Sequence, residues 1–218
     1  MKVWDLPTRL FHWSILAVVG FCWWTAETGR MEWHYRSGMV ALQLVAFRLI
    51  WGFIGSRTAR FSAFLRGPGA VLAYLRRPAD APHEAGHNPL GALSVVAMLL
   101  ALVTQIATGL FSVDVDGNVS GPLSHLVDFD LGRAAAAIHH VSFTALQMLV
   151  VLHVLAIGVY RLRGRHLVLP MITGRDRQIA AAPEGPPPHL WLRALAAVVA
   201  VFLLGWWVSA GAPVGISG

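Results

Sequence analysis

Long runs of apolar positions alternate along the chain with shorter segments rich in Arg, Gly and Pro. The apolar runs cover residues 10–27, 37–55, 89–112, 134–160 and 190–210. Each is close to or above the roughly 17–25 residues that an α-helix needs to cross a bilayer. None alternates apolar and polar positions with a period of two, as the strands of a membrane β-barrel do. The pattern therefore predicts an all-α integral membrane protein with five transmembrane helices.

Composition agrees with this class, because 56% of the 218 residues are hydrophobic and only 13% are charged, unlike a soluble globular domain. Lys2 before the first apolar run resembles the start of a secretory signal, but no small-residue cleavage pattern follows. We therefore expect a retained first helix. Cys22 is the only cysteine, which excludes an internal disulfide and the C-x-x-C-H motif of covalently attached haem.

The net charge of +6 reflects an asymmetry between loops. Only Arg30, Arg36 and Arg133 lie in the loops on one side. By the positive-inside rule, the other side is cytoplasmic, so the N-terminus is expected in the cytoplasm and the C-terminus in the periplasm. The charge thus predicts membrane topology, and no nucleic-acid partner is expected. The basic residues of the expected cytoplasmic side are Lys2, Arg9, Arg57, Arg60, Arg66, Arg76, Arg77, Arg161, Arg163, Arg165, Arg175 and Arg177.

Two histidines on the fourth apolar run share one helix face. His139 and His153 are fourteen residues apart, which brings the second side chain back to within roughly 40° of the first. Their spacing along the axis is roughly 21 Å, somewhat less than the hydrocarbon core of about 30 Å. One helix therefore offers an imidazole near each side of the membrane. His140 competes with His139, but its rotation of about 220° relative to His153 places it on nearly the opposite face.

Each of these histidines has a partner at matching depth on another predicted helix. His12 pairs with His153 in the cytoplasmic half, and His34 pairs with His139 in the periplasmic half. Ionisable groups at membrane depth mark functional sites. Two neutral imidazoles on one haem iron suit electron transfer. Taken singly, these histidines are also consistent with interfacial polar groups or interhelical hydrogen bonds.

Three further residues are candidate contacts of a cofactor or substrate. His87 and Asn88 begin the third apolar run and are candidates for a quinone or proton contact. Arg48 lies inside the second run, where it either extends to the lipid headgroups or binds a haem propionate. Outside the spans, Asp114, Asp116, Asp128 and Asp130 give the expected periplasmic side an acidic loop. This loop suits a positively charged partner protein.

Several short motifs together resemble the prokaryotic cytochrome b561 family. They are the W-D-x-P-x-R-x-x-H-W opening, HYRSG, FRLIWGFIG, GHNPLGAL, TGLF, the IHH…LHV pair and PMITG. The family also includes the b-type cytochrome subunits of nickel–iron hydrogenases. The resemblance covers about residues 2–174. It implies a four- or five-helix bundle that holds two b haems and exchanges electrons with quinone. The implied ligands are His12 and His153 for the inner haem, and His34 and His139 for the outer haem.

The resemblance divides the chain into a dihaem four-helix membrane domain, residues 1–174, and residues 175–218, a Pro-rich cytoplasmic linker with a fifth transmembrane helix. We expect an electron carrier in the bacterial inner membrane. It would link the quinone pool to a periplasmic redox partner, such as a c-type cytochrome or a hydrogenase-like protein. The alternatives are a hydrogenase membrane-anchor subunit and a superoxide:quinone oxidoreductase that acts at the outer haem.

Overall fold

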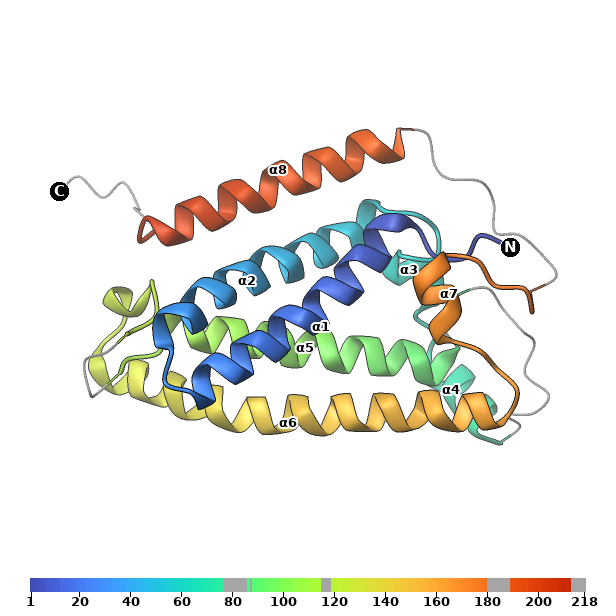
Figure 1. Ribbon diagram of the computed structural model, residues 1–218, viewed down its shortest axis with the longest axis horizontal. Helices are drawn as coiled ribbons and strands as arrows, with labels where there is room; N and C mark the ends of the chain where they lie inside the picture. The colour runs from blue at the N-terminus through green and yellow to red at the C-terminus, as the bar shows by residue number, and fades with distance from the viewer. Residues whose placement is uncertain (77–85, 87, 115–118, 180–188, 213–218) are drawn as a thin grey trace. The chain divides into compact units, whose positions relative to one another are not determined.

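The computed structural model describes residues 1–76, 86, 88–114, 119–179 and 189–212. All regular secondary structure in these residues is helical (Figure 1). The elements are α1 (Leu6–Glu27), α2 (Met31–Ile54), α3 (Phe61–Phe64), α4 (Pro68–Arg76), α5 (Pro89–Phe111), the 3-10 helix η1 (Ser124–Leu126), α6 (Phe129–Leu162), α7 (Val168–Thr173) and α8 (Leu190–Ser209).

Four helices of the described residues are long and apolar enough to cross a membrane, namely α2, α5, α6 and α8. The predicted all-α membrane architecture is therefore confirmed, together with four of the five predicted spans. Helix α1 has 22 residues but is not among these four, so a fifth span remains a prediction.

Capping residues determine where the helices start, and the hydrophobic pattern alone does not predict these positions. Helix α6 begins at Phe129, five residues before the predicted start at 134, because the Asp128 carboxylate accepts a hydrogen bond of 2.8 Å from the Leu131 backbone N–H. Asn88 caps α5 in the same way, because its side-chain oxygen accepts a hydrogen bond of 2.7 Å from the Gly91 backbone N–H. Such caps satisfy backbone donors that have no partner inside the helix.

The chain forms two compact units, each assembled from three segments. Unit 1 contains residues 1–12, 48–99 and 148–196, and unit 2 contains residues 13–47, 100–147 and 197–218. Helices α1, α2, α5, α6 and α8 contribute to both units. The predicted domain boundary at residue 174 remains a prediction, and much of the Pro-rich linker lies outside the described residues.

In unit 1, the first residues of the chain are fixed to the end of α7. Val3 N–H donates to the Gly174 carbonyl at 2.8 Å. Gly174 ends α7 with φ +78°, a conformation that favours glycine. A Cβ at this position would lie 2.9 Å from the Trp4 carbonyl oxygen. This junction sets the position from which α1 starts.

In unit 2, the second half of α8 packs against α2 and the end of α5. A Cβ atom at Gly205 of α8 would lie only 2.1 Å from Nε2 of Gln43 on α2. The glycine therefore permits the close contact between these two helices. The buried residues Leu123, Val208 and Ala212 form a core with the partly buried Met39, Leu42, Leu110, Phe111 and Leu204.

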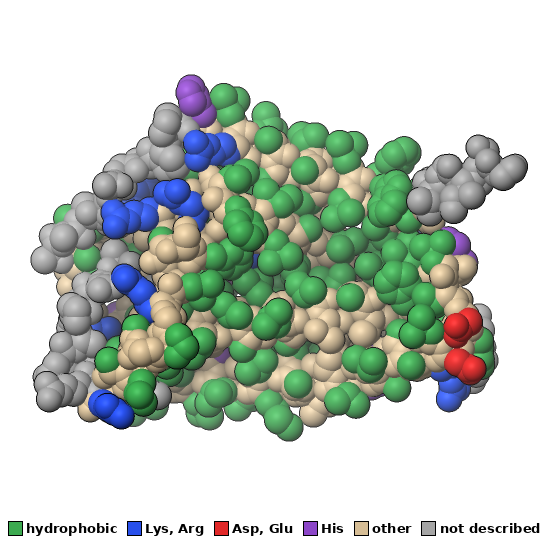
Figure 2. Space-filling model, turned by 180° about the vertical axis from the view of Figure 1, so that it is seen from behind, with side chains coloured by type: hydrophobic (Ala, Val, Ile, Leu, Met, Phe, Trp, Pro, Cys, Tyr) green, Lys and Arg blue, Asp and Glu red, His purple; other side chains and the backbone are tan. Residues whose placement is uncertain are grey.

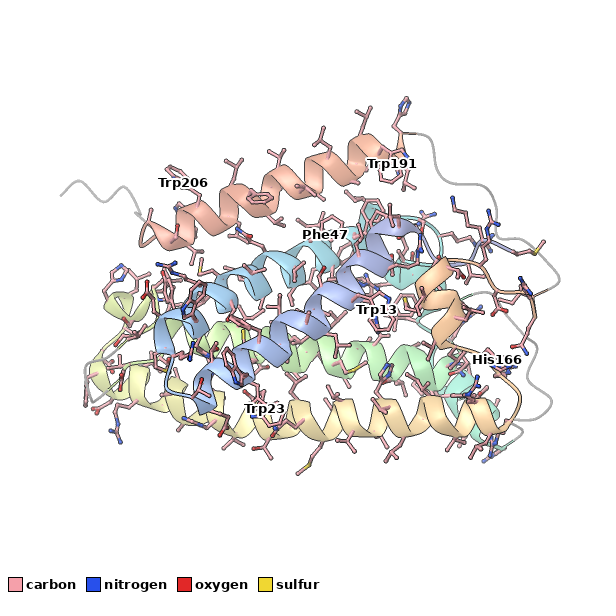
Figure 3. The ribbon with its side chains drawn as sticks, in the orientation of Figure 1. Trp13, Trp23, Phe47, His166, Trp191 and Trp206 are labelled. Atoms are coloured by element: carbon pink, nitrogen blue, oxygen red, sulfur yellow. The ribbon has the colours of Figure 1, made fainter. Side chains whose placement is uncertain are left out.

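The helical surface is apolar, as a lipid-facing surface requires. On α6, Val141 is 72% exposed and Leu162 is 90% exposed, and hydrophobic side chains cover most of the face in Figure 2. The indole side chains of Trp191 and Trp206 on α8 are exposed as well (Figure 3). Basic side chains gather at the loop end of unit 1 (Figure 2). Extended exposed apolar surface of this kind marks contact with lipid or with another protein.

Candidate functional site

Unit 2 brings His34 of α2 and His139 of α6 together. The centroids of the two imidazole rings are 6.1 Å apart, and the ring planes are nearly perpendicular at 86°. The pairing that the sequence predicted for these two histidines is thus present as a contact. The adjacent His140 lies exposed on α6.

Backbone carbonyls hold one nitrogen of each ring. His34 Nδ1 lies 2.9 Å from the Cys22 carbonyl oxygen of α1, and His139 Nδ1 lies 2.8 Å from the Gln105 carbonyl oxygen of α5. A carbonyl oxygen only accepts hydrogen bonds, so each Nδ1 carries the proton and donates. In the neutral ring this leaves the lone pair on Nε2, the tautomer that binds a metal through Nε2.

Three polar side chains of α5 and α6 surround His139. The Gln105 amide nitrogen lies 2.9 Å from His139 Nε2, and the Gln105 amide oxygen accepts a hydrogen bond of 2.5 Å from the Ser142 hydroxyl. The Thr108 hydroxyl lies 3.3 Å from His139 Nδ1. Metal binding at Nε2 requires the Gln105 amide to rotate away from that nitrogen. Backbone and hydroxyl oxygens of α5 would continue to orient the ring.

Gly109 provides the space that the His139 ring occupies. A Cβ built at Gly109 would lie 2.9 Å from His139 Cε1 and 3.2 Å from Nδ1. This glycine belongs to the TGLF motif, whereas Gln105 and Thr108 were not among the residues predicted for the site. Their spacing could have indicated a role, because Gln105 and Thr108 are polar residues three positions apart inside an apolar run and therefore share a helix face.

Unit 1 contains the second predicted pair, His12 of α1 and His153 of α6. Both side chains are half-buried. Thr8 lies one turn before His12 and is only 6% exposed. Each predicted histidine pair therefore lies within a single compact unit.

The remaining predicted contacts have different surroundings. Arg48 is 3% exposed and belongs to unit 1. Asn88 donates a hydrogen bond of 2.6 Å to the Tyr160 hydroxyl, which lies 2.9 Å from the Tyr74 hydroxyl. Burial and the neighbouring Tyr160 raise the pKa of Tyr74 to about 12, so Tyr74 stays protonated at neutral pH. His87 lies outside the described residues.

The His34–His139 pair would suit an iron held by two imidazoles. Two imidazole nitrogens that bind one metal ion at about 2 Å each have ring centroids roughly 6 Å apart, and the measured separation is 6.1 Å. Both rings have the tautomer with the lone pair on Nε2, and at His139 the Gln105 amide would have to leave that nitrogen before a metal binds. The donor set of two neutral imidazoles is one that haem iron accepts.

Comparison with known proteins agrees with this chemistry. The family model described as prokaryotic cytochrome b561 matches residues 3–174, a segment that includes all four predicted ligands. Comparisons with curated proteins and with solved structures find no match. The family consists of membrane b-type cytochromes that bind haem b and transfer electrons. The chain belongs to the prokaryotic cytochrome b561 family.

Proposed function

We propose that this protein is a dihaem b-type cytochrome that transfers electrons across the membrane between the quinone pool and a periplasmic redox partner. His34 and His139 would bind one haem, and His12 and His153 the other. Helix α6 supplies one histidine to each pair. The sequence places these two histidines on one face of that helix, roughly 21 Å apart along its axis.

The observation that carries this proposal is the arrangement of His34 and His139. A histidine pair that served only as an interhelical hydrogen bond would place a donor of one ring against an acceptor of the other. Here each Nδ1 instead contacts a backbone carbonyl, and the rings stand at a separation that suits one shared metal ion. This arrangement favours ligation over a structural role.

Haem b with two imidazole ligands takes up and releases one electron at its iron. Different residues of the chain would contribute to haem binding in different ways. The histidines would hold the iron, and a pair of imidazole ligands suits electron transfer rather than oxygen binding. The carbonyls of Cys22 and Gln105 fix the Nδ1 protons and make the ligands more basic. The apolar helices limit access of water and so contribute to the reduction potential.

Asn88 is a proposed contact for the quinone headgroup. Its amide is ordered by two contacts, one to Gly91 N–H and one to the Tyr160 hydroxyl. Together with the Tyr74 hydroxyl, these groups provide hydrogen-bond donors near the start of α5, which suits the carbonyl oxygens of a quinone. His87 precedes Asn88 in the sequence and is proposed for the same contact.

The direction of the chain across the membrane follows from charge. The expected cytoplasmic loops carry most of the basic residues, and the positive-inside rule then places the N-terminus in the cytoplasm. On the periplasmic side, Asp128 and Asp130 at the start of α6 would attract a basic partner such as a c-type cytochrome. Arg36 forms a 2.5 Å ion pair with Glu32, which reduces the positive charge that attraction of superoxide would need. This contact favours an electron carrier over direct superoxide oxidation.

Quinol should reduce the haem of the purified protein in detergent. We expect the absorption bands of reduced haem b to develop when a short-chain quinol is added anaerobically, because the proposed electron path connects a quinone site to the haems. Reduction of the same sample with dithionite gives the absorption of the fully reduced haems, with which the quinol result is compared. Absorption that develops with dithionite but not with quinol would remove the quinone part of the proposal and leave haem binding unaffected.

Gly109→Ala is expected to displace the His139 ring. The added methyl group would lie 2.9 Å from Cε1, and overpacking of this kind typically costs about 1–3 kcal/mol. We expect one of the two haems to be lost or to show an altered spectrum, measured by haem content and by the reduced-minus-oxidised spectrum.

The matched control is Ala107→Val, an enlargement at an exposed position on the same helix. It should retain two haems with the spectrum of the wild type. If Gly109→Ala also retains both haems with unchanged spectra and an unchanged unfolding temperature, then contact between Gly109 and His139 does not position a ligand.

A further inference from the structure

Arg48 is a charged side chain enclosed by the protein. It lies on α2 and is only 3% exposed, so its guanidinium does not extend to solvent or to lipid headgroups. Its Nη1 atom is buried without a hydrogen-bond partner among the described residues. Burying a charged group that no opposite charge pairs with is strongly unfavourable. Such a group is retained where an anion pairs with it.

An aromatic ring holds the guanidinium in place. The Arg48 Cζ atom lies 5.1 Å from the centroid of the Phe61 ring. The ring reaches this position because Gly52 has no side chain, since a Cβ at Gly52 would lie 2.1 Å from Phe61 Cε2. Stacking on a ring face engages the flat side of the guanidinium. The N–H donors lie in the plane of the group and remain directed to its edge.

Asp5 does not provide the missing anion. Its Oδ1 accepts a hydrogen bond of 2.7 Å from Thr8 N–H, and its Oδ2 accepts one of 3.0 Å from the Trp51 indole. No acidic oxygen of the described residues forms an ion pair with Arg48. The guanidinium is thus held against the Phe61 ring, and its Nη1 donors have no acceptor among the described residues.

The hydrogen bond between Asp5 and Trp51 joins this part of α2 to the start of α1, the helix that carries His12. Asp5 precedes His12 by seven residues, which corresponds to about 10 Å along α1 on the same helix face. Thr8 lies between them on this face, and its buried hydroxyl oxygen also has no hydrogen-bond partner among the described residues. The hydroxyl and the guanidinium are both donors suited to a carboxylate.

We propose that Arg48, together with the Thr8 hydroxyl, binds a propionate carboxylate of the haem held by His12 and His153. This inference rests on the proposed function, since it assigns the residues that bind the periphery of one of the two haems. Arg48 then compensates the negative charge of the carboxylate. Because the ferric state carries one more positive charge than the ferrous state, an uncompensated carboxylate stabilises the ferric state. Loss of the arginine charge therefore lowers the reduction potential of this haem.

The test is a redox titration of purified Arg48→Gln, with Arg48→Lys and the exposed Arg57→Gln as comparisons. The His34–His139 haem of the same molecule serves as an internal reference for folding. We expect Arg48→Gln to lower the midpoint potential of one haem or to lose that haem, while the other is unchanged. Arg48→Lys should shift the potential less, because it keeps the charge but loses the planar donor geometry. Arg57→Gln should match the wild type.

The affected haem is assigned by repeating Arg48→Gln in the His139→Ala background, where only the His12–His153 haem should remain. A shift in that background supports the inference. Two haems with unchanged potentials in Arg48→Gln would overturn it while the proposed function stands. A shift confined to the His34–His139 haem would overturn it as well. A wild-type protein without haem would instead overturn the proposed function, and the inference with it.

Discussion

Replacing His153 with alanine is expected to remove one of two haems from each chain. An alanine cannot bind iron, and His12 alone would then have to hold the haem. The other haem should remain, because its proposed ligands His34 and His139 belong to the other compact unit. The measurement is the ratio of haem to protein in the purified variant, together with its low-temperature absorption spectrum.

The matched control for this variant is His166→Ala. His166 is exposed in the loop after α6 (Figure 3), and its Nδ1 lies 2.7 Å from Arg161 Nη1. The same loss of an imidazole there should leave both haems in place. If His153→Ala binds as much haem as the wild type, His153 is not a ligand. If it loses both haems while His166→Ala keeps them, the two sites do not bind haem independently.

Replacing His139 and His140 one at a time should have opposite results. His139→Ala is expected to lose the second haem, since its ring faces His34 at 6.1 Å and its Nδ1 is fixed by the Gln105 carbonyl. His140→Ala should keep two haems, because His140 lies exposed on α6. The haem content and the spectra of both variants show whether His139 or His140 is the ligand. Retention of both haems in His139→Ala together with loss in His140→Ala would transfer the ligand role to His140.

The histidine pairing could be predicted because it depends on helix periodicity and membrane depth. The fourteen-residue spacing of His139 and His153 fixes their shared face on any uninterrupted helix. Helix α6 is uninterrupted from Phe129 to Leu162. The choice of His139 over His140 followed from the same angular argument, and the structure places His139 against His34.

The surroundings of the ligands could not be predicted from one helix at a time. The contact of Gln105 with His139 depends on how α5 and α6 face each other, and the sequence pattern of either helix leaves this open. The space that Gly109 provides depends on the same packing. Likewise, burial of Arg48 depends on Phe61, which lies at the start of the short helix α3. Periodicity identifies the residues that can meet, and packing between segments selects those that do.

The haem content of the purified wild-type protein tests the central claim most directly. The pyridine haemochrome assay identifies the haem type and, with a protein determination by amino-acid analysis, gives the number of haems per chain. The account predicts two non-covalently bound b haems per chain, both extractable with acidified acetone. A protein purified in folded form with no haem b, or with a single haem that survives both His34→Ala and His139→Ala, would contradict it.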